Sequence, residues 1–204
     1  MLEERYVVEA ARIRELELDR DADLLNPVFG EGVAESPLIM FIGEAPGREE
    51  AACGRPFVGK AGKQLDKMLE TAGIDRSKVF VTNTVKYRPM KKDGPRTSNR
   101  TPSAAEIRFG LDLLREEIVY VDPTIIATLG NVPLTAVMRL AGQIPEDQNV
   151  GTLHGMPTVF FISGKARKVF PLYHPAASIY NRELKPVLEN DLITLGRYAR
   201  SLEE

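Results

Sequence analysis

Three short apolar runs, separated by segments with helical periodicity, constrain the fold of this chain more than any other sequence feature. The runs are LIMFIG at 38–43, KVFVTNTVKY at 78–87 and TIIATLG at 124–130. Apolar runs bounded by turn residues are typical of strands covered on both faces. Strands that alternate with helices form a mainly parallel sheet with helices on both faces, so a three-layer α/β/α sandwich is expected.

The remaining segments predict the other elements. Ser103 followed by Glu106 has the form of a capping box and predicts a helix that extends to about residue 119. TVFFIS and KVFPLY flank the turn GKAR and predict a hairpin. Further helices are expected at 3–25, 61–73, 131–142 and 182–202. With 204 residues and 43% hydrophobic content, we expect a single domain over 1–204, with the helical segment 1–26 packed on it.

Composition excludes several classes of protein. A single cysteine, Cys53, and two histidines leave no internal disulfide and no dedicated metal site, because structural metal centres typically need about four ligands. No apolar run approaches the roughly 20 residues that span a bilayer, and the first 21 residues are too acidic for a secretory signal. We therefore expect a cytoplasmic protein with no membrane contact. Nothing in the sequence indicates an oligomer, so a monomer is expected.

A basic stretch lies between Lys86 and Arg100. The formal net charge of −2 gives no global sign of nucleic-acid binding, yet KYRPMKKDGPRTSNR carries six Lys or Arg against one Asp. Its Pro, Gly, Ser and Asn content predicts a loop and neither helix nor strand. This loop is a candidate phosphate contact, and a solvated linker explains the same charges.

Polar side chains follow three of the predicted strands. Glu44 follows the first, Asn83 and Lys86 lie toward the end of the second, and His174 follows the last strand of the hairpin. Ligands of parallel sheets bind beyond the carboxyl ends of the strands, so these side chains are expected to converge. A carboxylate, an amide and an imidazole can activate water, read a base edge and stabilise a departing anion. Structural alternatives stay open. Glu44 could accept hydrogen bonds from the N-terminal amides of the following helix, Asn83 could hydrogen-bond to free backbone groups near a strand end, and His174 could be a partly buried, hydrogen-bonded structural histidine.

Four motifs in order also resemble a known family. GEAPGREE, GRPFVGKAGKQLDKML, TNTVKYRP and HPA are similar, in sequence and spacing, to the uracil-DNA glycosylase superfamily, particularly its family 4 branch. The resemblance covers roughly residues 27 to 200. It implies a DNA repair enzyme of base excision, a monofunctional hydrolase that removes uracil from DNA without a cofactor and leaves an abasic site.

The resemblance also implies a role for each matching residue. Glu44 would orient or activate water, and His174 would stabilise charge on the leaving base. Asn83 would pair with the Watson–Crick edge of uracil and Phe57 would stack on its ring. The other implied positions are Gly43 and Ala45 beside the base, Glu50 as a second acid, Lys60, Lys86 and Arg88 at phosphates, and Ala177, Ile179 and Tyr180 at the minor groove. Ile179 or Tyr180 would act as a wedge.

The chain departs from the family pattern at the cysteines. Family 4 members hold a four-iron, four-sulfur cluster, but Tyr87 and Gly110 stand at two of its ligand positions and the first pair would fall near Glu15 and Leu18. Cys53 is at none of them, so we expect no cluster and no cofactor.

The base preference stays open at the sequence level. Gly47 stands where the best-known branch of the superfamily has a tyrosine that repels the thymine methyl, and Ala45 stands where that branch has aspartate. Two alternatives to uracil excision follow. One is a glycosylase for another deaminated base, such as hypoxanthine or xanthine, and the other is a non-catalytic DNA- or uracil-binding module.

Overall fold

The central feature of the computed structural model is a six-stranded, mainly parallel sheet with the order β2-β4-β3-β7-β9-β8. The structure describes residues 1–16, 22–24, 26–143 and 148–203. The parallel strands are β3 (Ile39–Gly43), β4 (Phe80–Asn83), β7 (Ile125–Leu129) and β9 (Lys165–Leu172). At the two edges, β2 (Glu31–Gly32) and β8 (Thr158–Ile162) run antiparallel to their neighbours.

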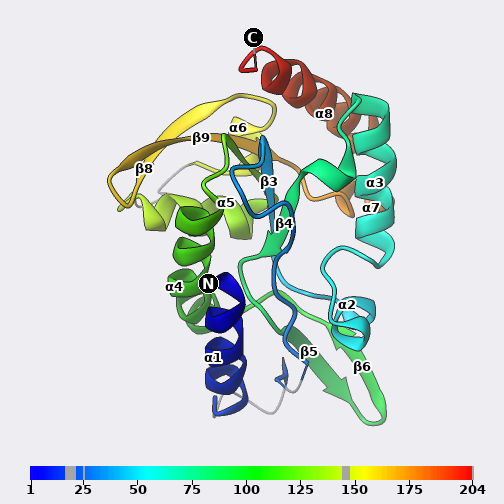
Figure 1. The fold of residues 1–204 in the computed structure, drawn as a ribbon. Helices are drawn as coiled ribbons and strands as arrows, with labels where there is room; N and C mark the ends of the chain where they lie inside the picture. Colours follow the sequence, from blue (N-terminus) through cyan, green and yellow to red (C-terminus); the bar gives the residue numbers. More distant parts are fainter. Residues whose placement is uncertain (17–21, 25, 144–147, 204) are drawn as a thin grey trace.

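Helices cover both faces of this sheet (Figure 1). On one face, α3 (Lys60–Ala72) and α8 (Leu184–Arg200) share an apolar core with Ile39 and Phe41 of β3. On the other, α4 (Ala104–Val121) and α5 (Asn131–Leu140) share a second core with Met40 and Ile42. Alternate residues of one strand thus enter opposite cores, which explains why LIMFIG is apolar throughout. The three-layer α/β/α sandwich with a mainly parallel sheet is confirmed.

The remaining elements are short or lie outside these layers. The N-terminal helix is α1 (Leu2–Arg14), and a small antiparallel sheet has the order β1-β5-β6. The bounds not yet given are β1 (Ala22–Asp23), β5 (Arg88–Asp93), β6 (Arg96–Asn99), α2 (Arg48–Cys53), the 3₁₀ helix η1 (Arg76–Lys78), α6 (Val150–Leu153) and α7 (Ala177–Tyr180). No helix among the described residues is long and apolar enough to cross a membrane.

Several element predictions are confirmed; the strand predicted at 78–87 is shorter, since β4 spans only Phe80–Asn83, and three other predictions are wrong. Ser103 caps α4, since its Oγ accepts from the Glu106 amide at 3.3 Å while the Glu106 carboxylate accepts from the Ser103 amide at 2.7 Å. The predicted 3–25 helix is too long, because α1 ends at Arg14 and Ala22–Asp23 pairs with β5; residues 17–21 and 25 lie outside the described residues. The GKAR turn is misplaced, since Ile162 already pairs with Lys165.

The third error concerns the basic stretch, which forms the β5–β6 hairpin and is no irregular loop. Asp93 pairs with Arg96, so the turn consists of two residues, and the first of them is Gly94 at φ 56°. A glycine with a positive φ at the first position of a two-residue turn is a common hairpin connection. The hairpin projects from the central sheet near α2 (Figure 1).

Candidate active site

The strand ends bring the predicted polar residues to one edge of the central sheet. Gly43 and Asn83 are paired neighbours at the ends of β3 and β4, and His174 follows β9 by two residues. Asn83, Phe57 and His174 line a pocket of about 430 Å³. Glu44 and His174 line an adjoining pocket of about 710 Å³, so His174 borders both. The convergence predicted from the sequence is therefore observed.

The wall of the smaller pocket depends on two glycines. A Cβ at Gly43 would lie 2.4 Å from the Asn83 Oδ1 atom and 2.5 Å from the Phe57 ring. A Cβ at Gly62, in the first turn of α3, would lie 1.8 Å from the Phe57 carbonyl oxygen. Only glycine at these two positions lets the ring, the amide and the helix approach so closely.

Phe57 itself is held in an unusual conformation. Its side chain is buried, yet its backbone φ is 56°, a value that residues other than glycine rarely adopt. Such strained backbone conformations persist only where the surrounding structure enforces them, and they are frequent at functional sites. The conformation keeps the ring against Gly43 and beside Asn83, which is the arrangement that a stacking surface for a flat ligand requires.

His174 is a neutral hydrogen-bond donor in this arrangement. Its Nδ1 atom accepts a hydrogen bond from the Ala176 amide at 3.2 Å, so the ring proton resides on Nε2. Burial lowers the pKa of the His174 imidazole below its usual value, because the charged form is poorly solvated there. The Nε2–H group can therefore donate to an oxygen that gains negative charge.

Glu44 is half-buried, and its environment favours a proton acceptor of increased basicity. Desolvation raises the pKa of its carboxyl above the usual value. Its main chain is fixed, since the Glu44 carbonyl accepts from the Val85 amide at 3.0 Å and the preceding Gly43 carbonyl accepts from the Thr84 amide at 2.8 Å. Glu44 lines the larger pocket together with His174, and a cavity of that size can hold a water molecule.

Glu50 holds two loops of the smaller pocket together. Its carboxylate accepts from the Gly47 amide at 3.1 Å and from the Gly59 amide at 2.7 Å. The first loop follows Glu44 and the second carries Phe57, so Glu50 fixes their separation. Ala45 lines both pockets beside these loops, and its contact with the base stays a prediction.

The predicted DNA contacts divide into two groups. Lys60 is exposed, begins α3 and lines the smaller pocket. Ala177 begins α7, where Ile179 and Tyr180 expose 50% and 90% of their surface and line the same pocket. Large apolar side chains so exposed at the mouth of a pocket have the placement of a wedge.

The two other predicted phosphate contacts are buried. Lys86 is 2% exposed and its ammonium lies 2.7 Å from the Glu117 carboxylate, so the prediction that it contacts phosphate is wrong. The cause is an acidic partner on α4, 31 residues further along the chain. Arg88 is 6% exposed and its Nε atom donates to the Asn99 Oδ1 atom at 2.7 Å, which ties β5 to β6 and corrects its assignment as a surface contact.

The hairpin region contributes pocket residues that the sequence analysis missed. Lys91, Arg100 and Thr101 line the larger pocket, and Asn99 lines both. The basic stretch was identified as a phosphate contact, but only the hairpin pairing brings these residues to the strand ends. The Arg100 guanidinium also donates to the Glu106 carboxylate at 2.9 Å, so its position is fixed by the start of α4.

The residues of this chain do not fit an iron–sulfur cluster. Tyr87 is 1% exposed and packs with Ile13 and Val85 in a third apolar core. A Cβ at Gly110 would lie 2.2 Å from the Thr84 carbonyl oxygen, which leaves no room for a cysteine side chain. Cys53 is exposed and is not part of this core, and the described residues contain no group of three or more His, Cys, Asp or Glu side chains that could hold a metal ion. At the position of Tyr87, near the end of the N-terminal helix, this apolar core occupies the space.

Comparison with known proteins identifies the family of this site. The model of the uracil DNA glycosylase superfamily matches residues 29–194. A type-4 uracil-DNA glycosylase of Sulfurisphaera tokodaii is 40% identical over 167 residues, which are 81% of this chain and 71% of that protein. The type-4 enzyme of Archaeoglobus fulgidus is 33% identical over 199 residues, which are 90% of this chain and 89% of that protein. The chain belongs to the uracil DNA glycosylase superfamily.

Proposed function

We propose that the protein is a uracil-DNA glycosylase, which hydrolyses the N-glycosidic bond of uracil in DNA and leaves an abasic site. The observation that carries the proposal is the shared pocket of Phe57, Asn83 and His174, with Glu44 in the adjoining pocket. The type-4 uracil-DNA glycosylases that resemble the chain support the same activity. The proposal includes a monomer that acts in the cytoplasm.

The base would be bound by groups of matching chemistry. An Asn83 amide offers one acceptor and one donor side by side, which complements the N3–H donor and the adjacent carbonyl acceptor of uracil. The Phe57 ring offers a flat apolar surface for the base. A nucleotide must leave the DNA stack to enter such a pocket, and the exposed Tyr180 and Ile179 at its mouth are suited to fill the gap.

Bond cleavage would use His174 and Glu44 in separate roles. The bonding electron pair of the glycosidic bond goes to the departing uracil, and the His174 Nε2–H group donates a hydrogen bond to its anionic oxygen. The Glu44 carboxylate stabilises the positive charge on the sugar and takes a proton from the water that attacks C1′. The uracil anion then takes up a proton from solvent and Glu44 releases the proton it took from water, so the products are free uracil and an abasic sugar; no step needs a metal or cofactor.

One assay separates this proposal from its alternatives. Labelled oligonucleotides that contain uracil, hypoxanthine or xanthine, single- and double-stranded, are incubated with the protein and then treated with alkali to cleave abasic sites. Scission at uracil is expected. Scission only at hypoxanthine or xanthine would assign another deaminated base, and no scission with retained DNA binding would indicate a binding module.

An Asn83→Ala variant tests the site within the same assay. It should excise uracil far more slowly, with little change in affinity for undamaged DNA, because the amide contacts the base and not the phosphates. A variant that unfolds instead would assign Asn83 a structural role.

A further inference from the structure

A buried polar network joins the N-terminal helix to the end of β4. Its centre is Glu117 of α4, which is 0% exposed. The Glu117 carboxylate accepts from the Lys86 ammonium at 2.7 Å and from the Tyr6 hydroxyl at 2.8 Å. The Thr82 hydroxyl donates to the same carboxylate at 3.0 Å. Three elements far apart in the sequence therefore meet at one buried charge.

The Lys86 ammonium makes two further hydrogen bonds, both to β4. It donates to the Thr82 Oγ1 atom at 2.7 Å and to the Asn83 carbonyl oxygen at 2.5 Å. With Glu117, these acceptors match the three donors of an ammonium group. No donor is left for a ligand, which distinguishes Lys86 from a substrate-binding lysine.

These contacts fix the peptide group that follows Asn83 from both sides. Its carbonyl accepts from Lys86, and its N–H, which belongs to Thr84, donates to the Gly43 carbonyl at 2.8 Å. The orientation of that peptide sets the direction in which the Asn83 side chain leaves the strand. A base-reading amide must be held within a fraction of an ångström to keep paired hydrogen bonds, so this clamp acts directly on recognition.

A buried ion pair is a poor device for stability alone. An apolar pair of similar volume is often as stable, because removing two charges from water costs about as much as their attraction returns. What an apolar pair cannot supply is a donor for the Asn83 carbonyl. The charged Lys86–Glu117 pair therefore indicates that the Asn83 carbonyl has to be held in a fixed position.

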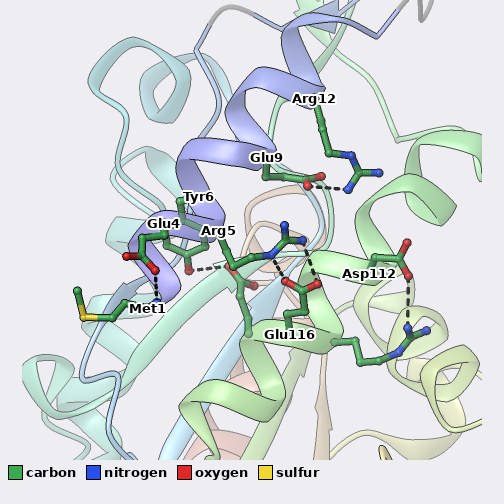
Figure 2. A network of polar contacts seen from close by, with 10 residues as sticks. Met1, Glu4, Arg5, Tyr6, Glu9, Arg12, Asp112 and Glu116 are labelled. Atoms are coloured by element: carbon green, nitrogen blue, oxygen red, sulfur yellow. Dashed lines mark hydrogen bonds and ion pairs between the residues drawn. The ribbon is translucent and has the colours of Figure 1, made fainter.

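We propose that Lys86, held by Glu117, which Tyr6 holds in turn, is a positioning residue that orients Asn83 for base recognition. The inference rests on the proposed uracil excision. Figure 2 shows Tyr6 and Arg5 of α1 directed at α4. Arg5 makes a separate pair with Glu116, at 2.9 Å between its Nη2 atom and Oε1, and this pair has no link to β4.

The test compares Lys86→Met, which leaves Glu117 buried without a cation, with the double variant Lys86→Met/Glu117→Leu. The single variant should lose stability, and the double variant should recover it because no unpaired charge remains. In the double variant kcat for uracil excision should stay about 10- to 100-fold below the wild-type value, the scale for a misplaced recognition group. KM for DNA and the affinity for undamaged DNA should not change.

Two outcomes would overturn the inference. One is a stable double variant with wild-type kcat, which would make the pair structural only. If the double variant does not fold, Tyr6→Phe is compared with Arg5→Ala, since each removes one tie between α1 and α4. Slower excision in Tyr6→Phe alone supports the inference, and equal rates in the two variants contradict it. A wild-type protein without uracil excision would instead refute the proposed function.

Discussion

Gly43→Ala provides a sharp test of the pocket geometry, because the added methyl group has a calculable effect. The new Cβ would lie 2.4 Å from the Asn83 Oδ1 atom and 2.5 Å from the Phe57 ring, so each must move by about 1 Å to reach ordinary contact. The Gly43 backbone itself is not in the left-handed region, so alanine adds no backbone strain.

The expected result is a large loss of rate in a protein that still folds. A misplacement of about 1 Å costs about 100-fold in rate, or about 2.7 kcal/mol of transition-state stabilisation. The displaced side-chain ends can move toward the pocket, so the loss of unfolding free energy should stay within about 1–3 kcal/mol. The loss of rate should therefore be measurable in a folded variant, and a control of similar stability cost distinguishes it from destabilisation.

Single-turnover excision of uracil from a labelled oligonucleotide, measured together with the melting temperature, gives both quantities. Ile162→Val is the matched control, since it removes about 1 kcal/mol of core packing from β8, away from both pockets. It should leave the excision rate unchanged. A folded Gly43→Ala variant with a wild-type rate would refute the assignment of Phe57 and Asn83 to base binding.

Three further predictions concern single side chains. The excision rate should rise with pH through the raised pKa of Glu44, and Glu44→Gln should abolish excision at every pH. This pKa is higher in the folded than in the unfolded state, so ionisation of Glu44 lowers the free energy of unfolding. The melting temperature of Glu44→Gln should therefore be higher than that of wild type at about pH 8 and equal to it at about pH 4. A lower melting temperature of the variant at pH 8 would contradict the raised pKa. Tyr87→Phe should raise the unfolding free energy by about 1 kcal/mol in a denaturant titration, because the buried hydroxyl has no hydrogen-bond partner within the described ranges; destabilisation would reveal one. Tyr180→Ala should slow excision from duplex DNA on the order of tenfold and from single strands much less, since unstacking is costly only in a duplex; equal losses on both substrates would exclude a wedge.

The parts of the fold that sequence reasoning predicted are those with a local signal. LIMFIG and TIIATLG are apolar because both faces of β3 and β7 are covered. Ser103 marks the start of α4 because its side chain caps the helix. The site followed from topology, since parallel strands must end at one edge of the sheet. Glu44, Asn83 and His174 converge for that reason.

The wrong predictions concern residues whose structure depends on partners far away in the sequence. Strand β6 is exposed at every residue, so no apolar pattern marks it, and its pairing with β5 alone forms it. Lys86 looks like a surface cation because its acidic partner Glu117 lies on another element. The pocket role of Asn99 depends on the same hairpin, which brings it to the strand ends.

The central claim is that the Phe57, Asn83 and His174 pocket, with Glu44, excises uracil. Its most direct test is the single-turnover release of uracil from a single-uracil oligonucleotide in a buffer with a metal chelator, for wild type and Asn83→Ala. We predict release by wild type, a rate at least about 100-fold lower for the folded variant, and no release from a thymine control. Two results would contradict this claim. One is an oligonucleotide that stays intact after incubation with the wild-type protein and alkali, and the other is an equal rate for the two proteins.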